Sequence, residues 1–265
     1  MITIGNELLI GKILNTNMCF LAKAVTDLGG NVTRATTVRD DVDEISSAIN
    51  EALNRKTDFI IACGGLGPTF DDKTLEAFSK AIDRPLELNE VALEYLKERY
   101  RRRYGDNPRE KFELTSSRLK MVRLPRSATP LRNPVGSAPG VYVKHRETVI
   151  VALPGVPEEM QAIFEQSVVP LIRELVGNIF RSEGSLKVTG IGESKVAPLI
   201  DTVMLTSPNV YIKSHPRHGQ GPTLELHLSI VSESEDVAKN SVKRAMEELS
   251  RLVADNGGEV ELMKT

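Results

Sequence analysis

The segment from Phe59 to Leu75 places the strongest constraint on how this chain folds, because it joins three features in one short run. It opens with the apolar residues Phe59–Cys63, a pattern typical of a parallel strand that is covered on both faces. A glycine-rich turn follows, and glycine allows both positive φ angles and close approach of the backbone to a bulky anion. The segment therefore predicts a strand, a tight turn and a helix, with an anion-binding surface at the turn.

Two adjacent carboxylates, Asp71 and Asp72, lie between the glycine turn and the predicted helix. Backbone amides at the start of a helix attract anions, and the helix dipole strengthens this attraction. Carboxylates beside a bound phosphate would repel it unless a divalent cation lay between them. The segment thus suggests a nucleotide or pyrophosphate site that uses a metal ion. A structural turn in which Asp71 or Asp72 caps the helix is the other interpretation, and the residues alone leave both open.

The first part of the chain alternates predicted strands with predicted helices. Strands are expected at Met1–Ile4, Asn31–Val38 and Phe59–Cys63, with a helix after each of them. Repeated strand–helix units favour a parallel sheet with helices on both faces, in which ligands bind beyond the carboxyl ends of the strands. Taken singly, an acidic residue in such a turn is typical of a helix cap or a solvated loop. Here the three turns together carry five acidic residues, which we expect to face one cleft: Glu7, Asp40, Asp41, Asp71 and Asp72.

Two further segments have the composition of binding loops. Pro130–Gly140 is rich in proline and glycine, which suits a loop whose backbone amides face a ligand but also suits an ordinary connector. Leu153–Met160 joins an apolar strand to a helix, with Pro157 near the first helical turn. Between these two segments, the residues Val141–Lys144 and Thr148–Leu153 predict a β-hairpin.

A long helix predicted from Pro157 to Val176 is followed by a break in the pattern at Gly177–Gly184. We therefore expect one domain over residues 1–177 and a second over residues 185–265. The second has the order β-α-β-β-α-β, which is typical of a small two-layer α+β domain. Its elements are expected at Ser185–Ile191, Gly192–Val203, Asn209–Ser214, Thr223–Val231, Ser234–Asn256 and Glu259–Met263.

Composition narrows the functional classes. The net charge of the 265 residues is −2, tryptophan is absent and aromatic residues make up 5%, which argues against a nucleic-acid partner. Cys19 and Cys63 have no metal-ligand spacing, so we expect reduced thiols and a cytoplasmic location. There is no signal-peptide pattern and no apolar segment of the roughly 18–20 residues that span a bilayer, so we expect no membrane partner.

Five motifs lie in register over nearly the whole chain: GNELLIGKILNTN (Gly5–Asn17), GGLGPTFDDKT (Gly64–Thr74), NPVGSAPG (Asn133–Gly140), LPGVPEEM (Leu153–Met160) and TGIGES (Thr189–Ser194). Together they resemble the motifs of the CinA family, whose first domain has the molybdopterin-binding fold of molybdenum-cofactor biosynthesis proteins. The resemblance implies an α/β protein: a three-layer, parallel-sheet, molybdopterin-binding-like domain followed by the small two-layer α+β domain.

The resemblance also implies roles for individual residues. Asp72 matches the acidic residue on which catalysis depends in the cofactor-synthesis relatives, while Asp40 and Glu7 match the acids of the second and first turns. Asp71, Asp72 and Asp40 are the expected metal ligands. Phosphate or pterin groups are expected to lie against the glycine turn and the two binding loops, at Gly64, Gly65, Gly67, Thr69, Asn133, Pro134, Gly136, Pro154 and Gly155.

CinA first domains are associated with metal-dependent hydrolysis of ADP-ribose to AMP and ribose 5-phosphate. The resemblance therefore implies a pyrophosphatase for ADP-ribose or a related dinucleotide. The implied cofactor is a Mg, Mn or Co ion, with potassium as a further candidate, and the implied assembly is a homo-oligomer. Many CinA proteins also carry a C-terminal domain that deamidates nicotinamide mononucleotide. This chain reaches Thr265 without that domain, so we do not expect deamidation.

Two alternatives stay open from the sequence. The first is a molybdopterin-binding or adenylyl-transfer protein, by analogy with relatives of the same fold. The second is a non-catalytic module, either a nucleotide sensor or an RNA binder that uses the small domain. An RNA-binding KH domain needs a Gly-x-x-Gly clamp, and Gly190 and Gly192 are too close together to provide one.

Overall fold

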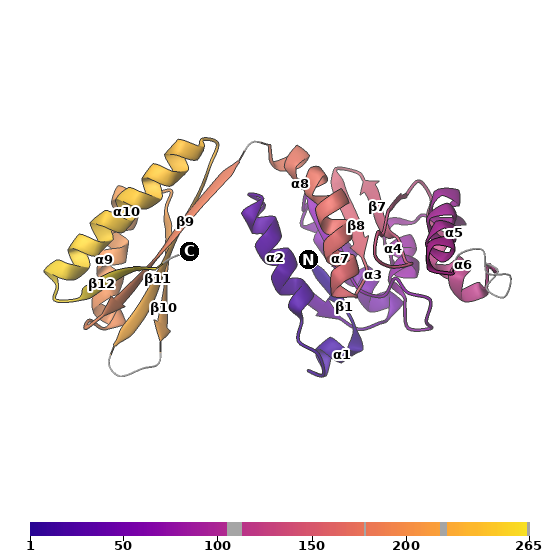
Figure 1. The fold of residues 1–265 in the computed structure, drawn as a ribbon, viewed down its shortest axis with the longest axis horizontal. Helices are drawn as coiled ribbons and strands as arrows, with labels where there is room; N and C mark the ends of the chain where they lie inside the picture. Colours follow the sequence, from indigo (N-terminus) through magenta and orange to yellow (C-terminus); the bar gives the residue numbers. More distant parts are fainter. Residues whose placement is uncertain (105–112, 178, 218–221, 264–265) are drawn as a thin grey trace. The chain divides into compact units, whose positions relative to one another are not determined.

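The computed structural model describes residues 1–104, 113–177, 179–217 and 222–263, and the chain forms two compact units (Figure 1). The first unit contains Met1–Thr26 and Asn31–Glu174, and the second contains Asp27–Gly30 and Leu175–Thr265. Each unit has a hydrophobic core of its own.

The first unit is built on a six-stranded sheet in the order β2-β1-β3-β8-β7-β6. The four strands β2, β1, β3 and β8 run parallel to one another, as predicted, whereas β7 pairs antiparallel with both β8 and β6. The predicted hairpin therefore joins β7 to β8 at the centre of the sheet. The strands are β1 (Ile2–Ile4), β2 (Thr36–Val38), β3 (Phe59–Cys63), β6 (Thr129–Leu131), β7 (Gly140–His145) and β8 (Thr148–Leu153).

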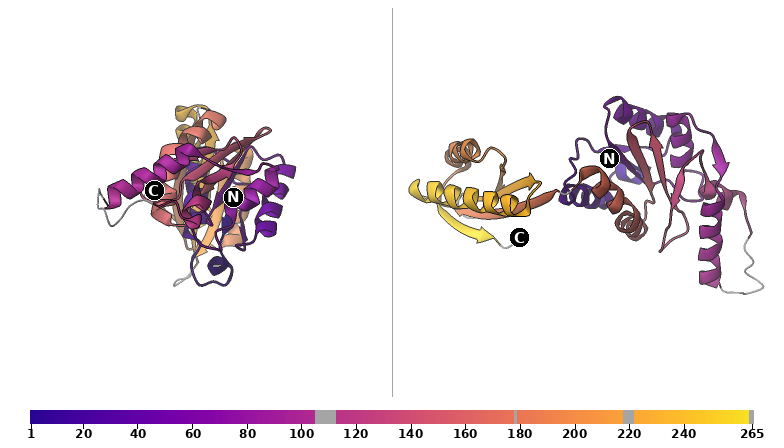
Figure 2. Two further views of the ribbon diagram at one scale, coloured as in Figure 1. Left: turned by 90° about the vertical axis from the view of Figure 1, so that its right-hand side faces the viewer. Right: turned by 90° about the horizontal axis from the view of Figure 1, so that it is seen from above.

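Helices lie on both sides of this sheet and complete a three-layer α/β unit (Figure 2). A separate two-stranded sheet pairs β4 (Leu86–Leu88) with β5 (Arg123–Pro125). The helix after β8 continues through one π-helical turn at Phe164–Val168. The helices are α1 (Asn6–Leu9), α2 (Thr16–Asp27), α3 (Val42–Asn54), α4 (Thr74–Ile82), α5 (Glu90–Tyr104), α6 (Ser116–Val122), α7 (Pro157–Ile163) and α8 (Val169–Val176).

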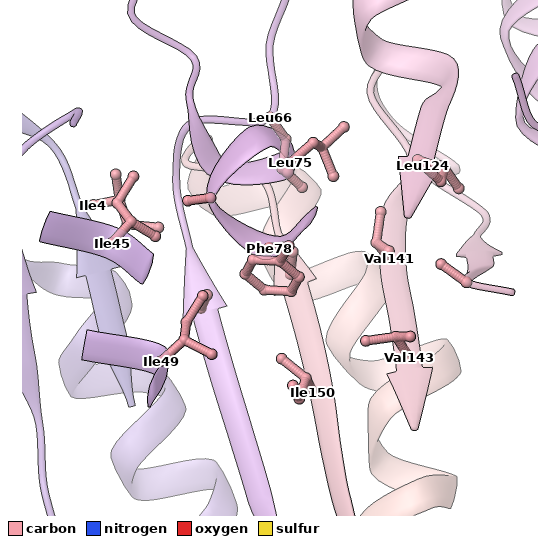
Figure 3. Close-up of a cluster of buried hydrophobic side chains, with 14 of the residues drawn as sticks. Ile4, Ile45, Ile49, Leu66, Leu75, Phe78, Leu124, Val141, Val143 and Ile150 are labelled. Carbon is pink, nitrogen blue, oxygen red and sulfur yellow. The ribbon is translucent and has the colours of Figure 1, made fainter. Parts of the chain in front are cut away.

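The core on one face of the sheet is centred on Phe78 of α4, whose side chain is fully buried (Figure 3). Apolar residues of α3 and of the central strands surround this ring, because alternate strand residues point to the same face. On α2 and the π-helical turn, Phe20 and Phe164 form an edge-to-face ring contact with centroids 5.9 Å apart. The residues around Phe78 include Ile4, Ile45, Ile49, Leu66, Leu75, Val141 and Ile150.

Element boundaries in the first unit also differ from the sequence prediction. Strand β2 begins at Thr36 rather than Asn31, because it pairs only with the three residues of β1. Helix α4 begins at Thr74, and its N-cap residue Lys73 makes no side-chain capping bond. The interpretation that Asp71 or Asp72 caps this helix is therefore wrong.

The second unit is a two-layer α+β arrangement with a four-stranded antiparallel sheet in the order β10-β11-β9-β12. The predicted order β-α-β-β-α-β is confirmed, although β9 begins at Phe180 rather than Ser185. Alternate residues of β11 from Leu224 to Ile230 are buried against the helices. The elements are β9 (Phe180–Thr189), α9 (Glu193–Thr206), β10 (Tyr211–Arg217), β11 (Thr223–Ser232), α10 (Glu235–Asp255) and β12 (Glu259–Met263).

Neither unit contains, in its described residues, a helix with the length and apolar character that crossing a bilayer requires.

Candidate functional site

The carboxyl ends of the four parallel strands meet at one edge of the first sheet, since neighbouring parallel strands run in the same direction. The turns after β1, β2, β3 and β8 all begin at this edge. These turns contain most of the site residues that the sequence predicted. The sheet topology thus brings together segments that are far apart in the chain.

Gly64 lies in a tight space between two of these strands. Its φ angle is +113°, and a Cβ atom there would lie 2.3 Å from the carbonyl oxygen of Ile4. Its amide donates a hydrogen bond to the carbonyl oxygen of Leu153 at 2.9 Å. On the β8 side, a Cβ atom on Gly155 would lie 3.4 Å from the Cα of Gly64. No residue with a side chain fits at Gly64 without moving β1.

Thr74, the first residue of α4, fixes the glycine turn to that helix. Its buried hydroxyl donates to the carbonyl oxygen of Gly64 at 2.7 Å, and its amide donates to the carbonyl oxygen of Gly65 at 3.2 Å. Thr74 is not among the site residues predicted from the sequence, because its spacing shows only a residue at the start of a helix. By contrast, the amides of Gly65, Leu66 and Gly67 donate no hydrogen bond within the described part of the chain. Three consecutive amides are therefore available to an anionic ligand.

Thr69 links the two carboxylates that follow the turn. Its amide donates to Asp72 Oδ2 at 2.7 Å, and its hydroxyl contacts both Asp72 Oδ2 at 2.6 Å and Asp71 Oδ1. A Cβ atom on Gly67 would lie 2.7 Å from Asp72 Oδ2, so a side chain at Gly67 would displace this carboxylate. The hydrogen bond from Thr69, and more weakly the charge of Lys120, lower the pKa of Asp71.

Asp40 lies in the turn after β2, where its Oδ2 accepts a hydrogen bond from the amide of Asn6 at 2.7 Å. Burial raises the pKa of the Asp40 carboxyl above its usual value, and the bond from Asn6 opposes that rise. The negative charges of Glu7, Asp71 and Asp72 raise the pKa further. The structure therefore brings acids from all three predicted turns within electrostatic range of one carboxylate. Asp41, in contrast, caps α3 by accepting bonds from two backbone amides.

The loop around Asn133 is held by its own side chains and by α7. The Asn133 side chain donates to Glu159 Oε2 at 2.6 Å and accepts bonds from the amides of Val135 and Gly136 at 3.0 and 2.7 Å. A Cβ atom on Gly136 would lie 1.9 Å from Glu159 Oε2, so a side chain there would displace the Glu159 carboxylate. Pro134, between these residues, is partly buried. Asn133 and Gly136 thus shape the loop through Glu159, which the sequence analysis did not single out.

The loop after β8 is fixed to the sheet edge through its carbonyl groups. The side-chain amide of Asn17 in α2 donates from Nδ2 to the carbonyl oxygen of Gly155 at 2.8 Å, and the thiol of Cys63 donates to the carbonyl oxygen of Pro154 at 3.2 Å. Burial raises the pKa of Cys63 to about 12, so the thiol stays protonated at neutral pH. Pro154 and Gly155 are therefore bound to neighbouring segments through their backbone.

A pocket of about 270 Å³ lies beside the glycine turn. Three predicted site residues, Gly65, Gly67 and Asp72, line it. The pocket lining does not include Glu7 or Asp40, and it includes no residue of the loop around Asn133 or of the loop after β8. The lining also includes three polar residues that were missed from the sequence, namely Ser116 and Lys120 of α6 together with Arg123. No pattern in the sequence places α6 beside a turn some fifty residues earlier, because the contact depends on tertiary packing.

Comparison with known proteins identifies the family. A family model described as a probable molybdopterin binding domain matches residues 1–174. A protein of Pyrobaculum arsenaticum is 41% identical over 259 residues, which are 97% of this chain and 95% of the relative. A protein of Sulfolobus acidocaldarius is 39% identical over 262 residues, with 98% and 96% covered. The crystal structure of CinA from Thermoplasma acidophilum, described as of unknown function, is 39% identical with a TM-score of 0.55, covering 66% of this chain and 96% of that one. The chain belongs to the CinA family.

The matched domain of this CinA-family chain contains every site residue described above. Among the residues that the structure describes, no three His, Cys, Asp or Glu side chains are gathered as a metal cage. Magnesium, however, is usually held by only one or two carboxylates together with ligand phosphates and water. Asp71 and Asp72 suit that arrangement, since both contact one hydroxyl group. Their donor chemistry therefore fits a divalent ion that ligand oxygens complete.

The tight space around Gly64 can be tested by substitution. We expect Gly64→Ala to lower the free energy of unfolding by about 2–4 kcal/mol, because the new Cβ atom meets the backbone of β1 in an unfavourable φ region. Gly11→Ala is the control: its φ is +69° but nothing lies within 4 Å, so about 1–2 kcal/mol is expected. Urea unfolding measures both, and equal losses would contradict the close approach at Gly64.

The convergence of the acidic turns can be tested through the pKa of Asp40. Glu7→Gln removes one negative neighbour, so the pKa of Asp40 should fall, while burial keeps it above its ordinary value. Titration of the carboxyl carbon by NMR gives this pKa directly. Glu147→Gln, in the turn before β8 at the other edge of the sheet, serves as the control. An unchanged pKa in Glu7→Gln would show that the first and second turns do not face each other.

Proposed function

We propose that this CinA-family protein is a nucleotide pyrophosphatase that hydrolyses ADP-ribose or a related dinucleotide. The observation that carries the proposal is the combination at one sheet edge of three available amides, Gly65 to Gly67, with acids from three turns. Free amides bind phosphate oxygens, and carboxylates beside them suit a metal ion and a proton acceptor. The choice of ADP-ribose rests on the family resemblance.

The chain's own residues would divide the work between them. The amides of the glycine turn would hold the pyrophosphate and stabilise the charge that develops on its oxygens. Water would attack one phosphorus atom, and the bridging P–O bond would break to give two monophosphates. Asp40 would accept the proton from the attacking water, a role that its raised pKa favours. Glu7 would keep that pKa raised through its negative charge.

Asp71 and Asp72 would hold a divalent ion such as Mg, Mn or Co. Bound there, such an ion would supply Lewis-acid polarisation of the pyrophosphate. Thr69 would keep the two carboxylates at a fixed separation, since its hydroxyl contacts both.

The proposal predicts a large effect of Asp72→Asn on AMP release. We expect the rate of ADP-ribose hydrolysis with Mg, Mn or Co to fall by about 10²-fold or more, because the uncharged amide is a poor metal ligand. Chromatography of the products measures the rate, and circular dichroism checks the fold. Asp58→Asn is the matched control, since Asp58 is exposed and precedes β3 at the opposite end of the same strand. Unchanged hydrolysis by Asp72→Asn would remove the proposed role.

A second candidate is supported by the family model, which describes a probable molybdopterin binding domain. On this alternative the same glycine turn would bind the phosphate of a pterin, and no hydrolysis would be needed. Equilibrium binding of molybdopterin and of ADP-ribose separates the two. The pyrophosphatase proposal predicts that ADP-ribose binds and releases AMP and that molybdopterin does not compete with it. Competition by molybdopterin, with no AMP release from ADP-ribose, would favour the second candidate.

A further inference from the structure

The pocket beside the glycine turn has two walls of different chemistry. One wall consists of the backbone at Gly65 and Gly67 and the side chain of Asp72. The other carries a hydroxyl and two cations, from Ser116, Lys120 and Arg123. Four leucines and Glu76 complete the lining, and the Glu76 carboxylate pairs with Lys73 at 3.6 Å. A ligand that fills the pocket therefore meets hydrogen-bond donors on both sides.

The two cations of the α6 wall have carbonyl groups as their partners. Lys120 Nζ donates to the carbonyl oxygen of Thr69, and Arg123 Nη2 donates to that of Leu86 at 3.0 Å. Within the described residues, neither side chain has a carboxylate within ion-pair distance. Many other cations of the first unit do have such a partner, among them Arg34, Arg55, Lys80, Lys97, Arg126 and Arg132. Lys120 and Arg123 thus keep most of their capacity to bind an anion.

The position of Lys120 connects this wall to the acidic turn. Its ammonium group contacts the backbone of Thr69, the residue whose hydroxyl holds Asp71 and Asp72. A phosphate placed between Lys120 and the available amides would be bound from both sides. A single phosphate can bind either the amides or the cations, whereas two linked phosphates can bind both groups at once.

We infer that Ser116, Lys120 and Arg123 form a second anion subsite, which holds one phosphate of a diphosphate ligand while the glycine turn holds the other. The inference rests on the proposed function for the reaction, but the subsite itself is a binding property. The inference specifies the class of ligand: the protein should bind a diphosphate more tightly than a monophosphate. The pocket volume, near the lower limit for ligand sites, suits the phosphates and part of one nucleoside rather than a whole dinucleotide.

Equilibrium binding of two probes, ADP-ribose and AMP, tests the subsite. Calorimetry without added divalent ion measures affinity apart from turnover. The wild-type protein should bind ADP-ribose more tightly than AMP, and Lys120→Met should reduce that preference by about 10-fold or more, as expected for loss of a charged hydrogen bond. Lys120→Arg, which keeps the charge, should retain most of the preference.

Lys144→Met is the matched control, because Lys144 lies on an exposed part of β7, away from the pocket lining. It should leave the preference unchanged. Thermal unfolding shows whether each variant folds, and Arg123→Met provides an independent test of the same wall. An unchanged preference in folded Lys120→Met and Arg123→Met, or a wild-type protein that does not prefer the diphosphate, would overturn the inference.

The outcomes also separate this inference from the proposed function. Lys120-dependent binding of ADP-ribose without AMP release, with and without divalent ions, would support the subsite and contradict the pyrophosphatase. Hydrolysis of ADP-ribose with the same KM in the wild-type protein and Lys120→Met would support the pyrophosphatase and overturn the subsite.

Discussion

The contact between Gly64 and the carbonyl group of Ile4 is the constraint on which the candidate site depends. Because the backbone of the turn lies directly against β1, the chain leaves β3 in one fixed direction. Thr74 then holds the turn from the other side through two hydrogen bonds. Between these two anchors, the amides of Gly65, Leu66 and Gly67 have no hydrogen-bond partner among the described residues, so they are available to a ligand.

Helix α4 carries the rigidity of the core to this turn. Its first residue, Thr74, binds the turn, and four residues later Phe78 occupies the centre of the core (Figure 3). A shift of the turn would therefore displace a large buried ring, which close-packed interiors resist. This coupling matters because Asp40 is held where burial, and more weakly the negative charges of Glu7, Asp71 and Asp72, raise its pKa. Packing of the core thus keeps the carboxylates of the acidic turns near one another, whereas in a less tightly packed structure they would move apart.

Local patterns in the sequence were sufficient for the architecture but not for the whole pocket. The apolar run of β3 and the repeated strand–helix units predicted a parallel sheet, because burial on both faces leaves a direct trace in composition. The short strands β4, β5 and β6 left no such trace and were missed. Asp71 and Asp72 were open to two interpretations, since helix caps and ligand-facing carboxylates use the same residue type. Lys120 and Glu159 reach the site only through tertiary packing, which no local period reveals.

The distribution of charge explains why an anionic ligand would complete the site. The hydrogen bond from Thr69, and more weakly the charge of Lys120, lower the pKa of Asp71, so the α6 wall balances only a small part of the acidic charge. Burial and the remaining acids still raise the pKa of Asp40, which means that this balance is incomplete. A phosphate alone would add to the negative charge, whereas a phosphate bound with a divalent ion would offset it. The acidic turns and the basic wall therefore have complementary roles, because the acids favour the ion and the cations favour the phosphates.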